Sequence, residues 1–138
     1  MRGRLETVEI DAPSLRGNPL GDPPRRPLLV YLPAGYDSGS DRYPVACFLH
    51  GLTGSARGWK NVQAFAPTVP ERLDALVAEG SVPPAIGVFP DGFTALGGTQ
   101  WIDAPAVGDY QTYLCRDVVG YVDGRYRTVR GPRARARA

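Results

Sequence analysis

The segment VACFLHGLTGSARGW, Val45 to Trp59, joins an apolar run to a glycine-rich loop. The run Val45–Leu49 shows no polar alternation, as expected for a strand buried on both faces of a parallel sheet. A second apolar run, Ala85–Phe89, precedes the sequence PDG. Between the two runs, Thr68 and Glu71 have the spacing of a capping box, which predicts a helix that begins there.

The flanking segments extend this pattern. Residues 7–12, TVEIDA, alternate between apolar and acidic side chains, which predicts a half-buried edge strand. Leu28–Leu32 is a further apolar strand that ends at Pro33, and Tyr110–Asp123 carries the apolar stripe of a helix that Gly124 stops. Strands that alternate with helices predict an α/β fold, with a mainly parallel sheet and an antiparallel N-terminal edge.

Composition and charge divide the chain into two parts. The 138 residues are 43% hydrophobic and 22% charged, which predicts one globular domain over residues 1–128. Residues 129–138 are predicted to be a basic, disordered tail. Residues 125–138 contain six arginines and no acidic residue: Arg125, Arg127, Arg130, Arg133, Arg135 and Arg137. Such a stretch can bind nucleic acid electrostatically, but only Tyr126 could stack on a base, so a solvated tail is favoured.

No membrane, cofactor or metal partner is expected from the sequence. No apolar stretch is long enough to span a bilayer, and the N-terminal sequence MRGRLETVEI lacks the apolar core of a secretory signal. We therefore expect a cytoplasmic protein. Cys47 and Cys115 lie in apolar sequence surroundings, which predicts buried free thiols rather than a disulfide or a metal pair.

Two loops are candidates for a ligand site, because ligands of α/β sheets bind at the carboxyl ends of the strands. These loops are HGLTGSARGW after the strand Val45–Leu49 and PDGFTALGGTQW after the strand Ala85–Phe89. Their glycines let backbone amides approach a ligand, and a free amide after a strand can stabilise a developing oxyanion. On spacing alone, a tight turn at His50-Gly51 is the favoured interpretation of the first loop.

Three stretches resemble, in the same order, a family of esterases. VYLPAGYDSGSDRYPVACFLHGLTGSARGW, FPDG and GDYQTYLCRDVVGYVDGRYRT are similar to the α/β-hydrolases that include esterase D-type S-formylglutathione hydrolases, feruloyl-type esterases and mycolyltransferases. The resemblance covers residues 25–128. It implies a partial α/β-hydrolase fold and a serine esterase or acyltransferase that acts on small acyl esters or thioesters through a Ser-Asp-His triad.

The resemblance also implies roles for individual residues. The Leu52 N–H would be an oxyanion donor, and His50 and Gly51 would shape its loop. The substrate-binding residues would be Trp59, Asp91, Gly92 and Trp101. For the two tryptophans, simple packing is an equally good interpretation.

The nucleophile and the general base are missing from this chain. The nucleophile of an α/β-hydrolase lies in the motif G-x-S-x-G. None of the serines has this context; they are Ser14, Ser38, Ser40, Ser55 and Ser81. Ser55 is interpreted as a loop or capping serine. His50 is the only histidine, and a pair of Cys47 or Cys115 with His50 is disfavoured because a thiolate in the apolar strand is costly.

The sequence YRTVRGPRARARA resembles the approach to the next strand of the family and then becomes alternating Arg-Ala. We therefore expect a truncated esterase that ends before the nucleophile elbow and is inactive by itself. The alternatives are a non-catalytic remnant that binds a partner or ligand, and a basic-tailed nucleic-acid binder. Without the family's fifth strand, Val45–Leu49 should be an exposed edge through which copies self-associate.

Overall fold

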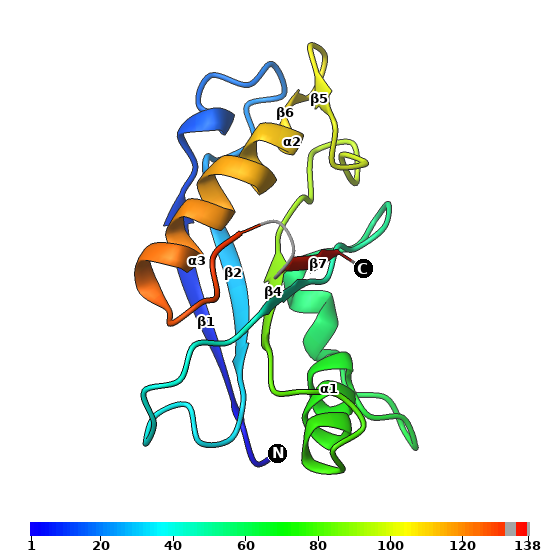
Figure 1. Ribbon diagram of the computed structural model, residues 1–138. Helices are drawn as coiled ribbons and strands as arrows, with labels where there is room; N and C mark the ends of the chain where they lie inside the picture. The colour runs from blue at the N-terminus through cyan, green and yellow to red at the C-terminus, as the bar shows by residue number, and fades with distance from the viewer. Residues whose placement is uncertain (132–134, 138) are drawn as a thin grey trace.

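The computed structural model describes residues 1–131 and 135–137. Its main sheet has the strand order β1-β2-β4-β3-β7 (Figure 1). The strands are β1 (Arg4–Asp11), β2 (Arg25–Leu32), β3 (Val45–Cys47), β4 (Ile86–Pro90) and β7 (Arg135–Arg137). β1, β2 and β4 pair antiparallel, whereas β3 pairs parallel with both β4 and β7. The sheet is therefore mixed: the antiparallel N-terminal edge is confirmed, and parallel pairing is confined to β4, β3 and β7.

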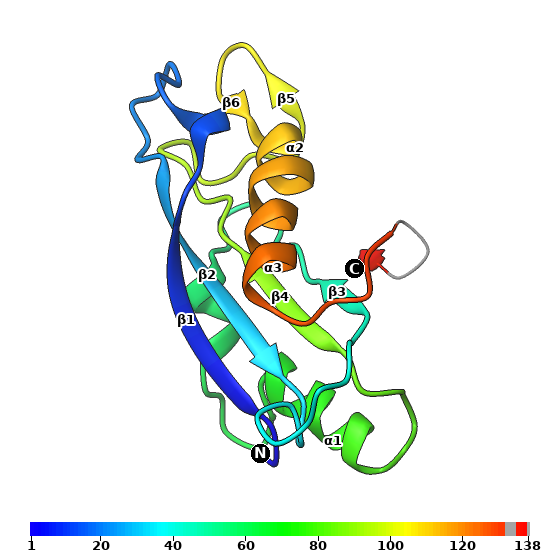
Figure 2. The ribbon, with the colours of Figure 1, turned by 60° about the vertical axis from the view of Figure 1, so that its left-hand side comes forward.

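Helices cover both faces of this sheet (Figures 1 and 2). One face carries a continuous helical stretch composed of α2 (Tyr110–Thr112), the π-helical segment η3 (Tyr113–Val118) and α3 (Val119–Arg125). The other face carries α1 (Val69–Ala78). The stripe predicted for the C-terminal helix packs into the larger core, where Leu114, Val118 and Val122 are buried.

The shorter elements complete the fold. Two 3-10 turns, η1 (Pro13–Leu15) and η2 (Ala56–Lys60), follow β1 and β3. A small hairpin of β5 (Asp103–Ala104) and β6 (Gly108–Asp109) leads into α2. The sequence predicts only loop for these segments, because two-residue strands are too short to show a hydrophobic period.

Helix α1 begins as its sequence predicts. The Thr68 side chain accepts from the Glu71 amide, and the Glu71 carboxylate accepts from the Thr68 amide, so the capping box is complete. Val69 and Leu73 pack on the small core of Leu29, Tyr31 and Phe89. Leu76, which the period also assigns to this face, is 41% exposed. The buried face of α1 is therefore narrower than predicted, because only its first turns lie on the sheet core.

The strand β3 is not an edge, contrary to the prediction of an exposed third strand. Val45, Ala46 and Cys47 are in register with Arg135, Ala136 and Arg137 of β7. Arg135–Arg137 are thus part of the sheet, whereas the sequence predicts a disordered tail from residue 129; residues 132–134 and 138 lie outside the described residues. Alternating Arg-Ala has little apolar surface, but a strand at an edge needs mainly backbone hydrogen bonds, which every non-proline residue supplies.

The structure separates the two cysteines by their exposure. Cys47 is buried, as predicted, but Cys115 is exposed, because it lies on the outer side of η3 next to the exposed Arg116. Within residues 1–131 and 135–137, no helix combines the length and apolar character needed to cross a membrane. The same residues contain no group of three or more His, Cys, Asp or Glu side chains arranged for a metal ion.

Asp74 of α1 accepts hydrogen bonds from the N-terminal residues of the chain. Its carboxylate, 6% exposed, accepts from the Arg2 amide at 2.8 Å, the Gly3 amide at 2.7 Å and the Tyr31 hydroxyl at 2.9 Å. Burial acts to raise the pKa of Asp74, but these hydrogen bonds outweigh it and hold the pKa below its usual value. The ionised carboxylate is therefore the form that stabilises the fold.

Replacing Asp74 by asparagine should destabilise the protein by about 1–3 kcal/mol at pH 7, because the amide cannot satisfy three donors as the carboxylate does. Since the folded pKa lies below that of the unfolded chain, the stabilisation is fully present above about pH 4 and is lost as the pH falls through the folded pKa. Urea unfolding at pH 7 and pH 3 should show a gap between the wild type and D74N that shrinks at low pH. Glu79→Gln on the same helix is the control, and a gap independent of pH would contradict this account.

Candidate functional site

Two loops meet at the carboxyl ends of β3 and β4: residues 48–60 and residues 91–101. The ring of His50 joins them, because its Nε2 accepts the Gly92 amide at 2.8 Å and its Nδ1 lies 2.9 Å from the Gly51 carbonyl oxygen. A backbone amide can only donate, so Nε2 is unprotonated and Nδ1 carries the proton. Both ring nitrogens of His50 are therefore occupied by main-chain groups.

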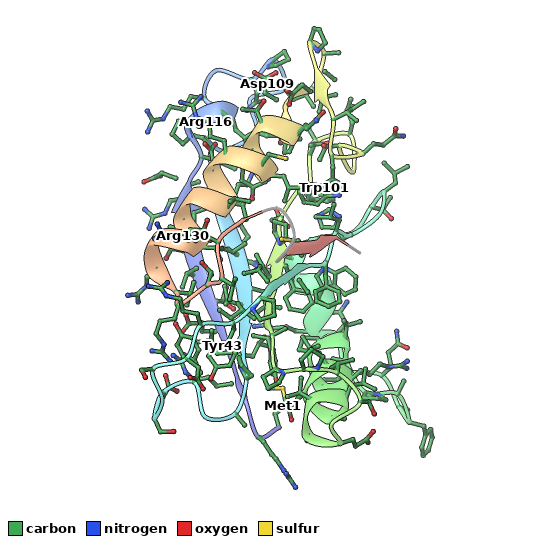
Figure 3. The ribbon with its side chains drawn as sticks, in the orientation of Figure 1. Met1, Tyr43, Trp101, Asp109, Arg116 and Arg130 are labelled. Atoms are coloured by element: carbon green, nitrogen blue, oxygen red, sulfur yellow. The ribbon has the colours of Figure 1, made fainter. Side chains whose placement is uncertain are left out.

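Three further hydrogen bonds join the two loops. The buried Asp91 accepts the Ala56 amide through Oδ1 at 2.7 Å. The indole Nε1 of Trp101 donates to the His50 carbonyl oxygen at 3.0 Å, and the Thr53 amide donates to the Gly97 carbonyl oxygen at 2.8 Å. In Figure 3, Trp101 lies beside the loop that follows β3. We call these three hydrogen bonds, together with the one from the Gly92 amide to His50 Nε2, the clamp.

Backbone strain is concentrated at the clamp. Thr53, Gln100 and Trp101 have φ angles of 65°, 55° and 58°, in the left-handed region. Among the described residues, only Phe65 is a further non-glycine case. Each such residue costs about 1–3 kcal/mol and persists only where its surroundings enforce it, and such residues are most frequent at functional sites. The β-branched Thr53 is the least suited of the three, which marks this loop as a functional candidate.

Leu52 lies at the centre of the first loop. Its side chain is 65% exposed, and its amide donates no hydrogen bond to any of the described residues. The two amides that follow it, by contrast, are engaged: Thr53 donates to the Gly97 carbonyl oxygen and Gly54 to the Gly51 carbonyl oxygen. A free amide next to hydrogen-bonded neighbours can donate to a ligand oxygen with little further ordering of the loop.

Two glycines allow the loops to approach this closely. A Cβ on Gly98 would lie 3.1 Å from Leu52 Cδ1 and 3.2 Å from its Cα. A Cβ on Gly92 would lie 2.9 Å from atoms of both Thr99 and Trp101, so a side chain there would displace the segment that donates to His50. Gly92 and Gly98 therefore serve the close packing of the two loops.

A cleft of about 370 Å³ opens beside the first loop, and Thr53, Ser55 and Asp91 contribute to its wall. Beneath it, Arg26 pairs with Asp91 at 3.3 Å, and their side chains are 5% and 8% exposed. Arg26 also donates to the Phe93 carbonyl oxygen at 2.7 Å and to the Tyr110 hydroxyl at 2.6 Å. Burial raises the pKa of Tyr110, although the nearby Arg26 acts against this shift, so the hydroxyl stays protonated.

The structure brings most of the predicted site residues together. His50, Gly51, Asp91, Gly92 and Trp101 all belong to the clamp or its hydrogen bonds. Trp59 instead packs on the α1 face, with ring centroids 5.7 Å from Phe89 and 6.4 Å from Phe48. This position fits the packing interpretation that the sequence left open for it.

The interpretation of Ser55 as a capping residue is confirmed. It is the N-cap of η2, and its Oγ accepts the Gly58 amide at 3.3 Å.

Sequence reasoning missed Arg26 and the Ala56 amide. Arg26 lies at the start of an apolar strand. The sequence Arg25-Arg26-Pro27 does not indicate that one of the two arginines points inward. Its role depends on pairing with Asp91, 65 residues away in the sequence, and a single sequence contains no signal for such a contact.

No family model matches the sequence. Solved structures with a similar fold include a ferulic acid esterase, with a TM-score of 0.80 and 23% identity over 98% of this chain and 48% of that one. A ferulic acid esterase from Anaeromyces mucronatus, solved with ferulic acid, has a TM-score of 0.65 and 21% identity over 98% and 47%. An S-formylglutathione hydrolase from Agrobacterium tumefaciens has a TM-score of 0.63 and 13% identity over 98% and 48%. The chain therefore shares the fold of the matched part of these esterases, and it spans about half of their length.

Proposed function

We propose that this chain supplies the oxyanion-stabilising part of a carboxylic ester hydrolase that acts on small acyl esters or thioesters. The observation that carries the proposal is the Leu52 amide, which makes no hydrogen bond within the described part of the chain and lies in a strained loop that the clamp holds. In ester hydrolysis the carbonyl oxygen becomes an anion in the tetrahedral intermediate. A preorganised amide stabilises this charge without the cost of reorienting water.

His50 positions this donor rather than acting as a base. Its Nε2 is used to accept the Gly92 amide, so a nucleophile could not transfer its proton there without breaking the clamp. Asp91 likewise positions the loop, because its carboxylate accepts the Ala56 amide and faces Arg26. Both residues thus act through the Leu52 amide and not on the reacting atoms.

The nucleophile and its base would come from outside the 138 residues. The sequence contains no G-x-S-x-G motif and no second histidine. Hydrolysis by attack of a serine needs both an activated hydroxyl and a group that accepts its proton. The names of the structural neighbours, ferulic acid esterase and S-formylglutathione hydrolase, support an ester or thioester as the substrate class.

The isolated chain should not hydrolyse p-nitrophenyl acetate faster than a heat-treated sample of the same chain, because one oxyanion donor without a nucleophile gives no acyl-enzyme. Release of p-nitrophenol and labelling by a fluorophosphonate probe are the two measurements. Stoichiometric labelling of any serine would overturn this prediction.

The positive test uses a hybrid enzyme. Residues 48–60 of this chain replace the structurally equivalent loop of the ferulic acid esterase with the TM-score of 0.80. If the loop forms an oxyanion site, the hybrid should keep hydrolysis within about tenfold of the parent, since only one donor is exchanged for an equivalent one. A hybrid that folds but has lost several orders of magnitude in kcat would count against the proposal and favour a binding role without catalysis.

A further inference from the structure

The cleft beside the first loop carries an excess of positive charge. Three arginines line it, Arg25, Arg26 and Arg57, against a single carboxylate, Asp91. Arg25 is neutralised from outside the cleft by Glu9, at 2.7 Å. Within residues 1–131 and 135–137, Arg57 has no ion-pair or hydrogen-bond partner. One cationic charge in the cleft therefore lacks a counter-ion.

The buried arginine adds to this imbalance. Arg26 meets Asp91 through one contact of 3.3 Å rather than a bidentate pair, and its other bonds go to neutral oxygens of Phe93 and Tyr110. Its Nε is buried and has no acceptor within the described residues. Asp91 also divides its charge between Arg26 and the Ala56 amide. A guanidinium that is only partly neutralised in a desolvated position attracts a further anion strongly.

We propose that this cleft binds a carboxylate carried on a small apolar group, with Arg57 as the direct partner and Arg26 as the buried source of positive potential. A monoanion fits because a single charge is unmatched, and a guanidinium presents the planar fork that a carboxylate accepts. The apolar part would lie against Phe93, which is half exposed at the cleft, and Pro23. The volume of about 370 Å³ is that of a site for a small molecule.

This site deepens the proposed function, and that part of the inference rests on it. Thr53 and Ser55, which follow Leu52 in the same loop, line the cleft, so the cleft is contiguous with the oxyanion loop. An ester bound with its carbonyl at Leu52 would place a second group in the cleft. We therefore infer a substrate that carries a free carboxylate besides the ester bond.

The test is binding to the full chain, which requires no turnover. Isothermal titration at low ionic strength would compare sodium benzoate with its neutral isostere benzamide and with phenyl phosphate. Benzoate should bind, benzamide should bind at least about tenfold more weakly, and 0.5 M NaCl should weaken the binding of benzoate but not that of benzamide. Equal binding of benzoate and benzamide would overturn the proposal, and tighter binding of phenyl phosphate would overturn its assignment to a carboxylate.

A matched pair of variants assigns the binding to Arg57. Arg57→Ala should weaken benzoate binding about tenfold or more, because it removes the charge-assisted hydrogen bonds. Lys60→Ala removes one positive charge from the same exposed turn, η2, but does not line the cleft, so it should leave binding nearly unchanged. An equal loss of benzoate affinity in both variants would show that only the overall charge matters and would refute the site. Since the hybrid enzyme tests hydrolysis and these titrations test binding, either can fail without the other.

Discussion

Deleting residues 132–138 should convert the protein into a self-associating, less stable form. The deletion removes β7 and leaves the outer edge of β3 without a neighbour. Val45 and Cys47 of that strand are buried, and no charged residue or proline interrupts Val45–Leu49. An uncovered apolar edge pairs readily with another chain, and each backbone hydrogen bond lost costs about 1 kcal/mol. We expect a melting temperature lower by about 5–15 °C and a larger apparent mass.

Size-exclusion chromatography with light scattering, followed by a thermal melt, measures both effects. Ala136→Pro keeps the length and charge of the chain but removes an amide from β7, so it should reproduce part of the loss. The double variant Arg135→Lys, Arg137→Lys keeps the charge and the backbone donors and should behave as the wild type. A truncated chain that stays monomeric with an unchanged melting temperature would show that β7 contributes nothing to the sheet.

The elements predicted correctly are those with local signals. The alternation of residues 7–12, the apolar runs of β2, β3 and β4, and the capping box of α1 each depend on side chains within a few positions of one another. Local periodicity and capping chemistry are sufficient for such elements. The proximity of the two candidate loops follows from the same information, because the loops after β3 and β4 must lie at one end of adjacent parallel strands.

The features that escaped prediction depend on contacts between distant residues. The pairing of β7 with β3 joins positions 90 residues apart, and its Arg-Ala sequence has the composition of a solvated tail. The clamp has a partial signal in the sequence: His50 and Asp91 are among the predicted site residues, but the amides from which they accept hydrogen bonds are not. Backbone amides are present at every position, so a sequence cannot show which of them is used.

The exposed Cys115 and Leu76 show a related limit. Helical periodicity indicates an apolar stripe, but the width of the buried face depends on how much of the helix the sheet covers. Trp59 and Trp101 both follow glycine-containing loop sequences. Trp59 packs on the core of Leu29, Tyr31 and Phe89, whereas Trp101 donates one of the hydrogen bonds of the clamp.

The central claim is that the Leu52 amide stabilises an oxyanion. In the hybrid enzyme that carries residues 48–60, Leu52→Pro removes this N–H, whereas Leu52→Ala retains it and removes only the exposed side chain. Loss of one oxyanion donor lowers kcat by about 10²–10³-fold. The account predicts such a drop in kcat for L52P with little change in KM, and nearly full activity for L52A. Circular dichroism melts of both variants control for folding. A folded L52P hybrid with the kcat of L52A would contradict the account.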